Sequence, residues 1–491
     1  MVDTFKYLLV AAYVVATYAL SFHGMKKAAG LRGFSIGNKD LSPVLVGLTM
    51  AASIASTATF VINPGFVYTH GLSAYIHYGI AGYLGIAAAL LLLCKGFRRL
   101  GDEGGALTIP HWMYGRYRSR GLSLFFALIN LLSITFVVLI LVGCAILCAS
   151  LFDISQRSAL ILVIIFVFSY VLMGGAYAHA YTNGFQAVFM VLISLFLFVS
   201  GWKYLGGDPL GSLAAVSANY AAVFNPESAL YYDLFSVGIS SFLITFALMM
   251  QPHILTKTLY LKGEEDVNRF LITALITGFL FTLVLFVGFY ARIKGLEVDR
   301  QDLVVAAYIE SEFGASESGK LLAAFITVAL LAAGMSTLDG ILVAISAMVV
   351  NDLYLPFRRF GAAADGAQKE GLLLSRLVLV AVAVLATVLA WNPPPLVGLF
   401  AQKGVYGLAA ASFAPILLGV WLKPPPPAWI MGLAAATGLF THLLLNLFLG
   451  FHNPSVSASW AILAGLTLSG LLLWINRTTI VKKQVSPGGN P

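Results

Sequence analysis

The chain has 491 residues, of which 59% are hydrophobic and only 10% are charged, and its mean hydropathy is +0.90. A soluble protein of this composition would expose apolar side chains over its whole surface, so the composition excludes a soluble domain and predicts a polytopic membrane protein. The net charge of +8 suits anionic lipid head groups, so we expect the lipid bilayer, and no nucleic acid, among the partners.

Apolar runs of about 18 residues or more are long enough to cross a bilayer. The sequence contains thirteen, at 5–23, 43–68, 71–94, 121–148, 158–175, 182–202, 234–250, 270–291, 318–348, 373–391, 395–422, 427–449 and 458–476. We therefore expect an all-α protein with about thirteen transmembrane helices. An odd number of spans places the two termini on opposite sides of the membrane.

The charges between these runs indicate the orientation. Most of the 29 Lys and Arg residues fall on one side, in the segments 25–42, 95–120, 251–269 and 350–376 and in the C-terminal tail. The opposite segments carry ten acids: Asp153, Asp208, Glu227, Asp233, Glu297, Asp299, Asp302, Glu310, Glu312 and Glu317. Loops rich in Lys and Arg stay in the cytoplasm. The sequence therefore predicts a multi-pass protein of the cell (inner) membrane, with its N-terminus outside and its C-terminus cytoplasmic.

Two of the runs carry polar groups where lipid tolerates only hydrocarbon. The second run contains Ala-Ala-Ser-Ile-Ala-Ser-Thr-Ala-Thr at 51–59, and the ninth contains Ala-Gly-Met-Ser-Thr-Leu-Asp at 333–339. Hydroxyls and acids at bilayer depth mark functional sites. Together these two helices can present oxygen atoms to a bare cation, which indicates a sodium-driven carrier.

The order of the spans suggests internal symmetry. Spans two to six and seven to eleven form two sets of five, and because five is odd the second set starts from the opposite face. The first member of each set carries small or polar residues at mid-membrane, at 51–59 and at 238–245. We expect these parts: an extra N-terminal helix and inside loop (1–42), a first inverted repeat (43–203), an outside loop (204–233), a second inverted repeat (234–422), and two C-terminal helices with a cytoplasmic tail (423–491).

Several short motifs, in this order on the span map, resemble one family. They are Phe34-Ser35-Ile36-Gly37-Asn38, Gly174-Gly175 before Thr182 and Gln186, Gln251-Pro252-His253-Ile254, and Met335-Ser336-Thr337 followed by Asp352-Leu353-Tyr354. Over nearly its whole length the chain is similar to the sodium/solute symporter family of bacterial proline, pantothenate, sugar, sialic acid and monocarboxylate carriers. The resemblance implies a leucine-transporter-like bundle of five-plus-five inverted repeats, Na⁺ as the coupling ion, and alternating-access symport of a small-molecule solute.

The same resemblance implies a sodium site between the second and ninth spans. Its ligands are the carbonyls of Ala52, Ala55 and Ala333 and the hydroxyls of Ser336 and Thr337. Na⁺ is a hard cation that takes oxygen ligands, and a helix break frees carbonyls for it. The alternative is that the two hydroxyls only bond back to carbonyls of their own helix.

The chain departs from the family pattern at two acidic positions. Ile54 stands where proline-type members have a carboxylate, and Asn183 stands where many members have Asp. The two losses favour a single Na⁺. We expect Asn183, Gln186 and Asp339 to support or couple this site, with a helix-packing hydrogen bond as the alternative role for Asp339.

Seven residues bear on the identity of the solute. By analogy with the family, Ser56, Thr59, Tyr78, Ser241 and Thr245 face the solute cavity, and Gln402 and Lys403 lie where members contact solute. A lysine at that depth favours a carboxylate, unless it reaches out to the interface along its own stem. We expect a monocarboxylate or pantothenate-like organic acid, with a proline-type amino acid or a sugar as alternatives.

One segment of the chain resembles an enzyme motif but lacks a required residue. Residues 314–320 resemble a phosphate-binding loop, but Leu321 stands where Ser or Thr must hold Mg²⁺. We therefore expect a carrier and not an enzyme. We also expect the carrier to be a monomer. A transporter-like membrane sensor is the alternative from a different functional class.

Overall fold

The computed structural model describes residues 2–28, 30–358, 364–394 and 396–485, and every regular element in these ranges is helical. The main helices are α1 (Val2–Lys27), α3 (Pro43–Ile54), α4 (Asn63–His70), α6 (Gly82–Glu103), α8 (Arg120–Ile129), α9 (Ile134–Phe152), α10 (Gln156–Ser200), α13 (Ser240–Leu248), α15 (Asp266–Thr282), α16 (Phe286–Ile293), α18 (Glu317–Met348), α20 (Ala364–Ala390), α21 (Val397–Trp421), α22 (Ala428–Leu443) and α23 (Pro454–Val485).

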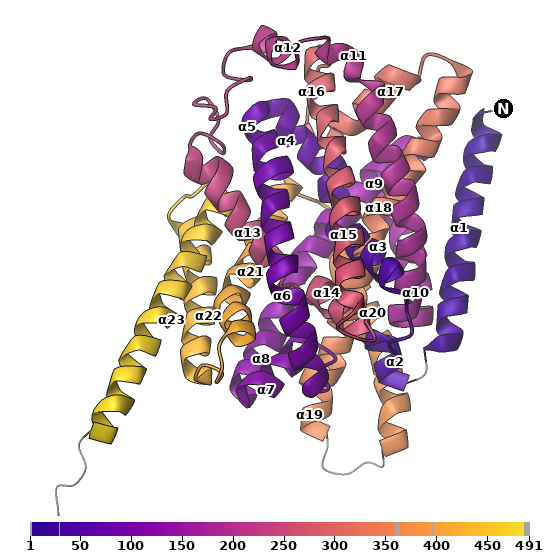
Figure 1. The fold of residues 1–491 in the computed structure, drawn as a ribbon. Coiled ribbons are helices and arrows are strands. Elements are labelled where there is room, and N and C mark those ends of the chain that lie inside the picture. Colours follow the sequence, from indigo (N-terminus) through magenta and orange to yellow (C-terminus); the bar gives the residue numbers. More distant parts are fainter. Residues whose placement is uncertain (1, 29, 359–363, 395, 486–491) are drawn as a thin grey trace, which may run out of the picture.

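Shorter elements connect or extend them (Figure 1). The short α-helices are α2 (Gly30–Ile36), α5 (Leu72–Tyr75), α7 (Ile109–Tyr117), α11 (Trp202–Leu205), α12 (Pro209–Val216), α14 (Pro252–Leu255), α17 (Val304–Phe313) and α19 (Leu355–Arg358). The π-helical segments are η1 (Ala58–Ile62), η2 (Ile76–Ala81), η4 (Phe235–Ile239), η8 (Val349–Tyr354) and η9 (Leu444–Phe448), and the 3₁₀ segments are η3 (Asn130–Ser133), η5 (Thr256–Tyr260), η6 (Leu283–Leu285) and η7 (Gln301–Leu303).

The number of membrane spans agrees with the sequence. Eleven helical stretches among the described residues are long and apolar enough to cross a bilayer, and the number reaches thirteen if each of two bent helix pairs is one span. Each of the thirteen predicted runs has one counterpart. The fold is therefore the expected all-α membrane bundle.

The two bent pairs are the spans predicted to open the two repeats. The chain bends by 53° between Pro43–Ile54 and Ala58–His70, and by 62° between Phe235–Leu248 and Pro252–Tyr260. In the second pair the cause is local: Pro252 has no N–H to donate, and Gln251 before it is extended, with φ −67° and ψ 149°. Both breaks lie inside the bundle, where they leave backbone carbonyls without helical partners.

A third break lies inside α10, at Gly175. This residue has φ 54° and ψ −139°, and it divides the helix into the spans Gln156–Met173 and Gly175–Leu205. A Cβ atom here would lie 2.4 Å from the carbonyl oxygen of Phe34. The sequence placed a connecting segment between residues 175 and 182, but the second span begins at Gly175 itself because one glycine makes the turn.

Burial separates a central group of helices from a peripheral one. The spans built on α9, α18 and α21 are mostly buried, whereas those of α1 and α20 are mostly exposed to the surroundings of the bundle. At the centre, α18 packs against α3, α9 and α10, and α1 packs on the outside of α10 and α18. The two stretches with hydroxyls at bilayer depth, in α3 and α18, therefore meet inside the protein.

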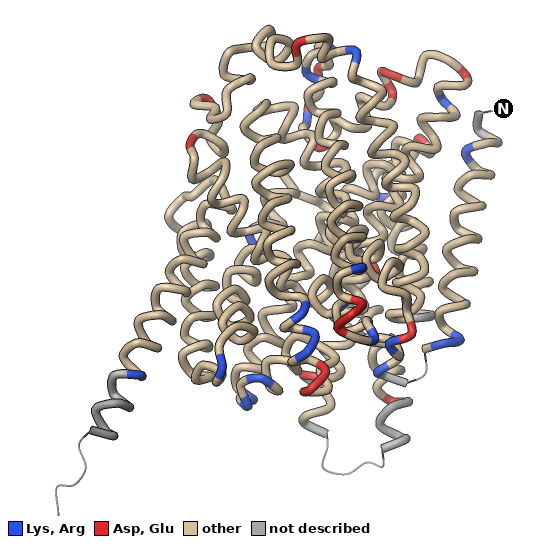
Figure 2. The backbone as a smooth tube through the Cα atoms, in the orientation of Figure 1, with Lys and Arg blue, Asp and Glu red and all other residues tan. Residues whose placement is uncertain are grey.

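Charge divides the two ends of the bundle. We call the end that holds α2, α7, α8 and α19 the lower end and the end that holds α5, α11 and α12 the upper end (Figure 1). Figure 2 shows many of the Lys and Arg residues gathered towards the lower end, where acids also lie, and a smaller mixture of acids and bases at the upper end. Helix α1 begins at the upper end and α23 ends at the lower end, as an odd number of spans requires.

Candidate functional site

The hydroxyl-rich stretches of α3 and α18 form one buried group of oxygens. Ser336 Oγ donates to the carbonyls of Ala52 at 2.9 Å and Ala333 at 2.8 Å. Thr337 Oγ1 donates to the carbonyls of Ala52 at 3.2 Å and Ser53 at 3.1 Å. All five residues are buried, and we refer to these oxygens as the oxygen cluster. Ser336 also bonds back to Ala333 of its own helix, but each of the two hydroxyls bonds to α3 as well. The alternative, in which both hydroxyls bond only to carbonyls of α18, therefore does not describe the structure.

The break after α3 explains why these carbonyls are accessible. The helix ends at Ile54, and Ala55 has φ −88° and ψ 86°, outside the helical range. Carbonyls in the last turn of a helix lose their N–H partners. Ser56 begins a new turn, since its carbonyl accepts from the N–H groups of Thr59 and Phe60. The free carbonyls therefore face α18, and Ala55 adjoins them in the break.

The donor set suits a sodium ion. Carbonyl and hydroxyl oxygens are the ligands that hard cations take, and unwound helices in transporters supply them for Na⁺. One more buried polar side chain adjoins the cluster. Asn183 of α10 donates from Nδ2 to Ser336 O at 2.6 Å and to Ser53 Oγ at 3.1 Å, while its Oδ1 atom is buried without a hydrogen-bond partner. The structure thus places Asn183 beside the cluster.

Asp339 lies on the same helix as the cluster but faces a different set of groups. Its carboxylate is 2.8 Å from His179 Nδ1 and accepts longer hydrogen bonds of 3.4 Å from Tyr170 and Thr182. Lys257 is also close: its Nζ atom would lie 3.5 Å from a Cβ atom added at Gly340. Sequence reasoning missed His179 and Lys257, because Lys257 falls in the segment 251–269, which the charge pattern assigns to a cytoplasmic connection between two spans.

Gln186 is tied to the first helix. Its Nε2 atom donates to the Tyr13 hydroxyl at 2.7 Å, and that hydroxyl lies 3.6 Å from the sulfur of Met335. The Oε1 atom of Gln186 is buried without a partner. Gln186 therefore connects α1 and α10 behind the cluster and does not join it.

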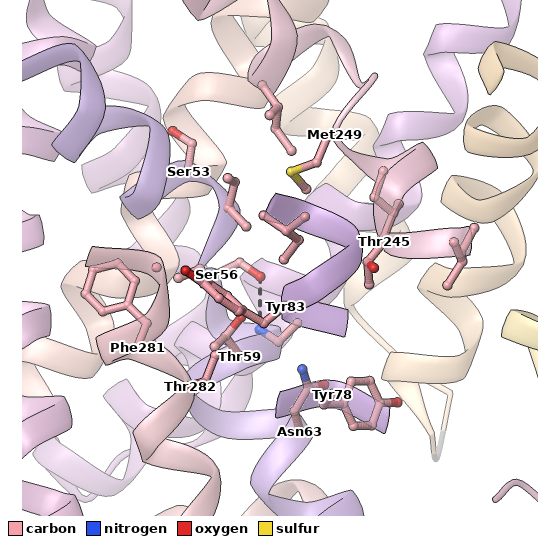
Figure 3. Close-up of a pocket in the computed structure, with 18 of the residues that line it drawn as sticks. Ser53, Ser56, Thr59, Asn63, Tyr78, Tyr83, Thr245, Met249, Phe281 and Thr282 are labelled. Atoms are coloured by element: carbon pink, nitrogen blue, oxygen red, sulfur yellow. Dashed lines mark hydrogen bonds between the residues drawn. The ribbon is translucent and has the colours of Figure 1, made fainter. Parts of the chain in front are cut away.

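A cavity of about 160 Å³ opens beside the broken part of the second span. Figure 3 shows Ser53, Ser56 and Thr59 on one side of it and Thr245 and Met249 on another. Six of the residues predicted to face the solute line it, namely Ser56, Thr59, Tyr78, Ser241, Thr245 and Gln402. Ser53 and Ala55 also line it, so the cavity and the oxygen cluster share a wall.

Lys403 does not meet the expectation for it. The residue is exposed and does not line the cavity, and its backbone carbonyl accepts a hydrogen bond from His442 Nε2 at 3.0 Å. Gln402 lines the cavity instead, because neighbouring residues on a helix point about 100° apart. Among the described residues that line the cavity there is no Lys, Arg, Asp or Glu.

Aromatic rings cover the upper side of the cavity. Tyr78 packs against Phe66 and Tyr231, with ring centroids 5.5 and 6.0 Å away, and the Tyr231 hydroxyl donates to that of Tyr78 at 2.9 Å. Tyr231 is only 2% exposed. Its segment is anchored to the bundle, since Asn225 donates from Nδ2 to the carbonyl of His70.

Comparison with known proteins also indicates a sodium-coupled carrier. The model of the family described as "Sodium:solute symporter family" matches residues 34–424. The chain is 26% identical to a sodium/proline symporter of Staphylococcus aureus (strain Newman), over 84% of this chain and 80% of that one. It is 24% identical to the sodium/pantothenate symporter of Escherichia coli (strain K12), over 93% and 94% of the two chains.

Solved structures confirm the fold. A substrate-bound, outward-open Na⁺-coupled sialic acid symporter superposes with a TM-score of 0.74 at 17% identity, covering 95% of this chain and 97% of that one. Mhp1, a nucleobase-cation-symport-1 family transporter, gives 0.55 at 14% identity, covering 92% and 96%. The leucine-transporter-like fold is therefore established. The family match shows Na⁺ as the coupling ion and a small molecule as the solute. The chain is a multi-pass membrane transporter, not an enzyme, and belongs to the sodium:solute symporter family.

Proposed function

We propose that the chain takes up a compact organic solute with one carboxylate and a largely apolar body, coupled to one Na⁺ held by Ala52, Ala55, Ala333, Ser336 and Thr337. The observation that carries this proposal is that the oxygen cluster adjoins the cavity: Ser53 belongs to both, and Ala55, in the break beside the cluster, also lines the cavity. A solute in the cavity lies next to the bound ion, so the ion acts on the solute directly.

Charge is the reason for preferring a carboxylate. All five proposed ligands are neutral, and the nearby acid Asp339 is engaged by His179. Bound Na⁺ thus brings a positive charge that its ligands do not neutralise, and the charge acts across a region of low dielectric. The described lining of the cavity offers no charged side chain. A solute carboxylate that faces the oxygen cluster supplies the negative charge that balances Na⁺. In this proposal Na⁺, and not Lys403, is the cation that attracts the carboxylate.

The size and the polarity of the cavity narrow the class of solute. A dry cavity of about 150 Å³ holds a molecule as large as benzene, so a cavity of about 160 Å³ suits a compact solute. Its wall includes many apolar side chains, among them Ile54, Leu139, Met249 and Phe281. These features favour a monocarboxylate. The proline carrier among the relatives makes a proline-like amino acid the second candidate, and the apolar wall counts against a sugar.

The proposal extends to the orientation in the membrane and to the two repeats. The lower end, where Lys and Arg gather, is assigned to the cytoplasm, which leaves the N-terminus outside. Residues 43–203 and 234–422 form the two inverted repeats. Their support is that each begins with a span bent by more than 40°.

The test is a panel of matched solutes offered to the purified protein with and without Na⁺. A ligand that binds the folded state raises its apparent stability. We expect stabilisation by a small monocarboxylate only when Na⁺ is present, with much less from its amide, an equally small sugar, or the acid with K⁺. Uptake of the labelled acid into sealed vesicles then distinguishes a carrier from a sensor. Equal stabilisation by the acid and its amide would contradict the proposed role of charge.

A further inference from the structure

Helix α1 lies against the bundle but leaves two adjoining recesses along its inner side. The first, of about 170 Å³, is bordered by Lys6 of α1, Leu151 of α9, Glu310 of α17 and Lys320 of α18. Three of these four side chains carry charge, two positive and one negative. A recess with this lining suits a head group that contains both an anion and a cation.

The second recess is apolar and continues the first along the same helices. It measures about 240 Å³, and its walls include Val10 and Val14 of α1, Phe166 of α10, and Leu331 and Met335 of α18. Val10 follows Lys6 by one helical turn, and Thr327 of the charged recess is followed by Val328 of the apolar one. The two recesses therefore adjoin along α1 and α18, with the charged one nearer the start of α1 at the upper end (Figure 1). On α9 they lie level with each other, since Leu151 lines the first and Phe152 the second.

This order matches a lipid in a bilayer leaflet. From Lys6 to Val14 the helix rises about 12 Å, at about 1.5 Å per residue, which takes a chain from the head-group level into the hydrocarbon. A phosphate suits the two lysines, because each ammonium has three donors, and in the structure Lys6 Nζ also donates to the carbonyl of Leu151 at 3.3 Å. A primary ammonium group suits Glu310, because it can donate hydrogen bonds to a carboxylate whereas a quaternary choline group cannot.

We propose that this crevice binds a phospholipid with a phosphoethanolamine head group, whose phosphate pairs with Lys6 and Lys320, whose ammonium pairs with Glu310, and whose acyl chain lies between Val14 and Leu331. The inner end of the crevice is Met335, the residue before Ser336 of the oxygen cluster. Tyr13 also lines this end, and its hydroxyl contacts both Met335 and Gln186. The lipid tail therefore lies directly behind the proposed sodium site. The site depends on neither the identity of the solute nor the orientation in the membrane.

The test measures lipid retained by the full-length protein in detergent, by native mass spectrometry after adding dioleoyl phosphatidylethanolamine or dioleoyl phosphatidylcholine. We expect the parent to prefer the ethanolamine lipid. The two lysines supply charge-assisted hydrogen bonds to the phosphate, so the double variant Lys6→Gln, Lys320→Gln should weaken retention by about tenfold or more. The control is Lys203→Gln, which removes an exposed lysine elsewhere at the upper end and should change little.

Two further variants separate the head group from the tail. Glu310→Gln should abolish the preference for ethanolamine over choline while both lipids still bind. Val14→Phe fills the apolar recess and should reduce retention of both lipids, whereas Val15→Phe, at a position that is 67% exposed on the same helix, should not. The proposal is overturned if the double lysine variant retains as much lipid as Lys203→Gln, if the parent does not distinguish the two lipids, or if Val14→Phe behaves like Val15→Phe.

Discussion

The hydroxyls of Ser336 and Thr337 have two roles available to them. In the structure they donate to carbonyls of α3, and each oxygen keeps lone pairs that can turn towards a cation when the hydroxyl rotates. The same hydroxyl oxygens can thus serve either a hydrogen bond to α3 or a bound cation. These hydroxyls also hold α3 against α18 when no ion is bound.

Replacement of either hydroxyl by Ala should therefore weaken Na⁺ binding. One interaction with a charged group contributes about 1.5–3 kcal/mol, so Ser336→Ala or Thr337→Ala should raise the Na⁺ concentration for half-maximal uptake by about tenfold or more. The control is Ser346→Ala, because this buried hydroxyl of α18 bonds only within its own helix, to Val343 O at 3.2 Å. If the double Ala variant responds to Na⁺ like Ser346→Ala, the site lies elsewhere.

Lys403 and Gln402 provide a second test at the same scale. Only Gln402 lines the cavity, so Gln402→Met should raise the solute concentration for half-maximal uptake by about three- to tenfold, the effect of one lost hydrogen bond. Lys403→Gln should leave both that concentration and the preference for an acid over its amide unchanged. A shift in that preference on changing Lys403 would restore the lysine to the cavity.

These residues show where sequence reasoning stops. Adjacent hydroxyls in an apolar helix indicate a site without reference to any other segment, so the sequence alone draws attention to Ser336 and Thr337. The depth of Lys403 was also evident, but the face it occupies depends on how α21 is rotated against its neighbours. His179 lies 160 residues from Asp339, and no local pattern connects residues so far apart in the chain.

Among the elements, α10 changes direction at a single residue, Gly175. Gly175 has φ 54° and ψ −139° and stands against the backbone of Phe34. This backbone conformation is open essentially to glycine alone. The two spans of α10 can therefore follow each other without a connecting loop. Hydropathy predicted both spans, but it could not show that one glycine joins them.

Gly175→Ala should destabilise the protein. The new Cβ atom would lie 2.4 Å from the carbonyl oxygen of Phe34, and the strained backbone adds about 1–3 kcal/mol to the free energy of the folded state. We expect a lower melting temperature, measured in detergent without solute. Gly121→Ala is the matched control, since its Cβ would meet nothing within 4 Å, and it should be neutral or slightly stabilising. Equal melting temperatures for the two variants would contradict the proposed role of Gly175.

At the scale of the whole molecule, the span map was the most predictable feature. Each predicted apolar run corresponds to one span or one bent pair, because hydrocarbon admits only segments whose backbone groups are internally bonded. The bends were less predictable. Pro252 announces one of them, but the break after Ile54 has neither proline nor glycine beside it, and it is stabilised by contacts with α18 that only the folded bundle provides.

Orientation in the membrane is the property that ties the molecule to its function, because uptake requires the Na⁺ site to load from outside. Lys and Arg gather at the lower end, where α23 ends, and such an end stays in the cytoplasm. A reporter that fluoresces only in the cytoplasm, fused after Pro491, should therefore be bright. The matched control is the same reporter fused to a chain truncated after residue 450, between α22 and α23, which should be expressed but dark. A dark full-length fusion together with a bright truncated one would reverse the orientation, and the oxygen cluster would then have to load from the opposite side.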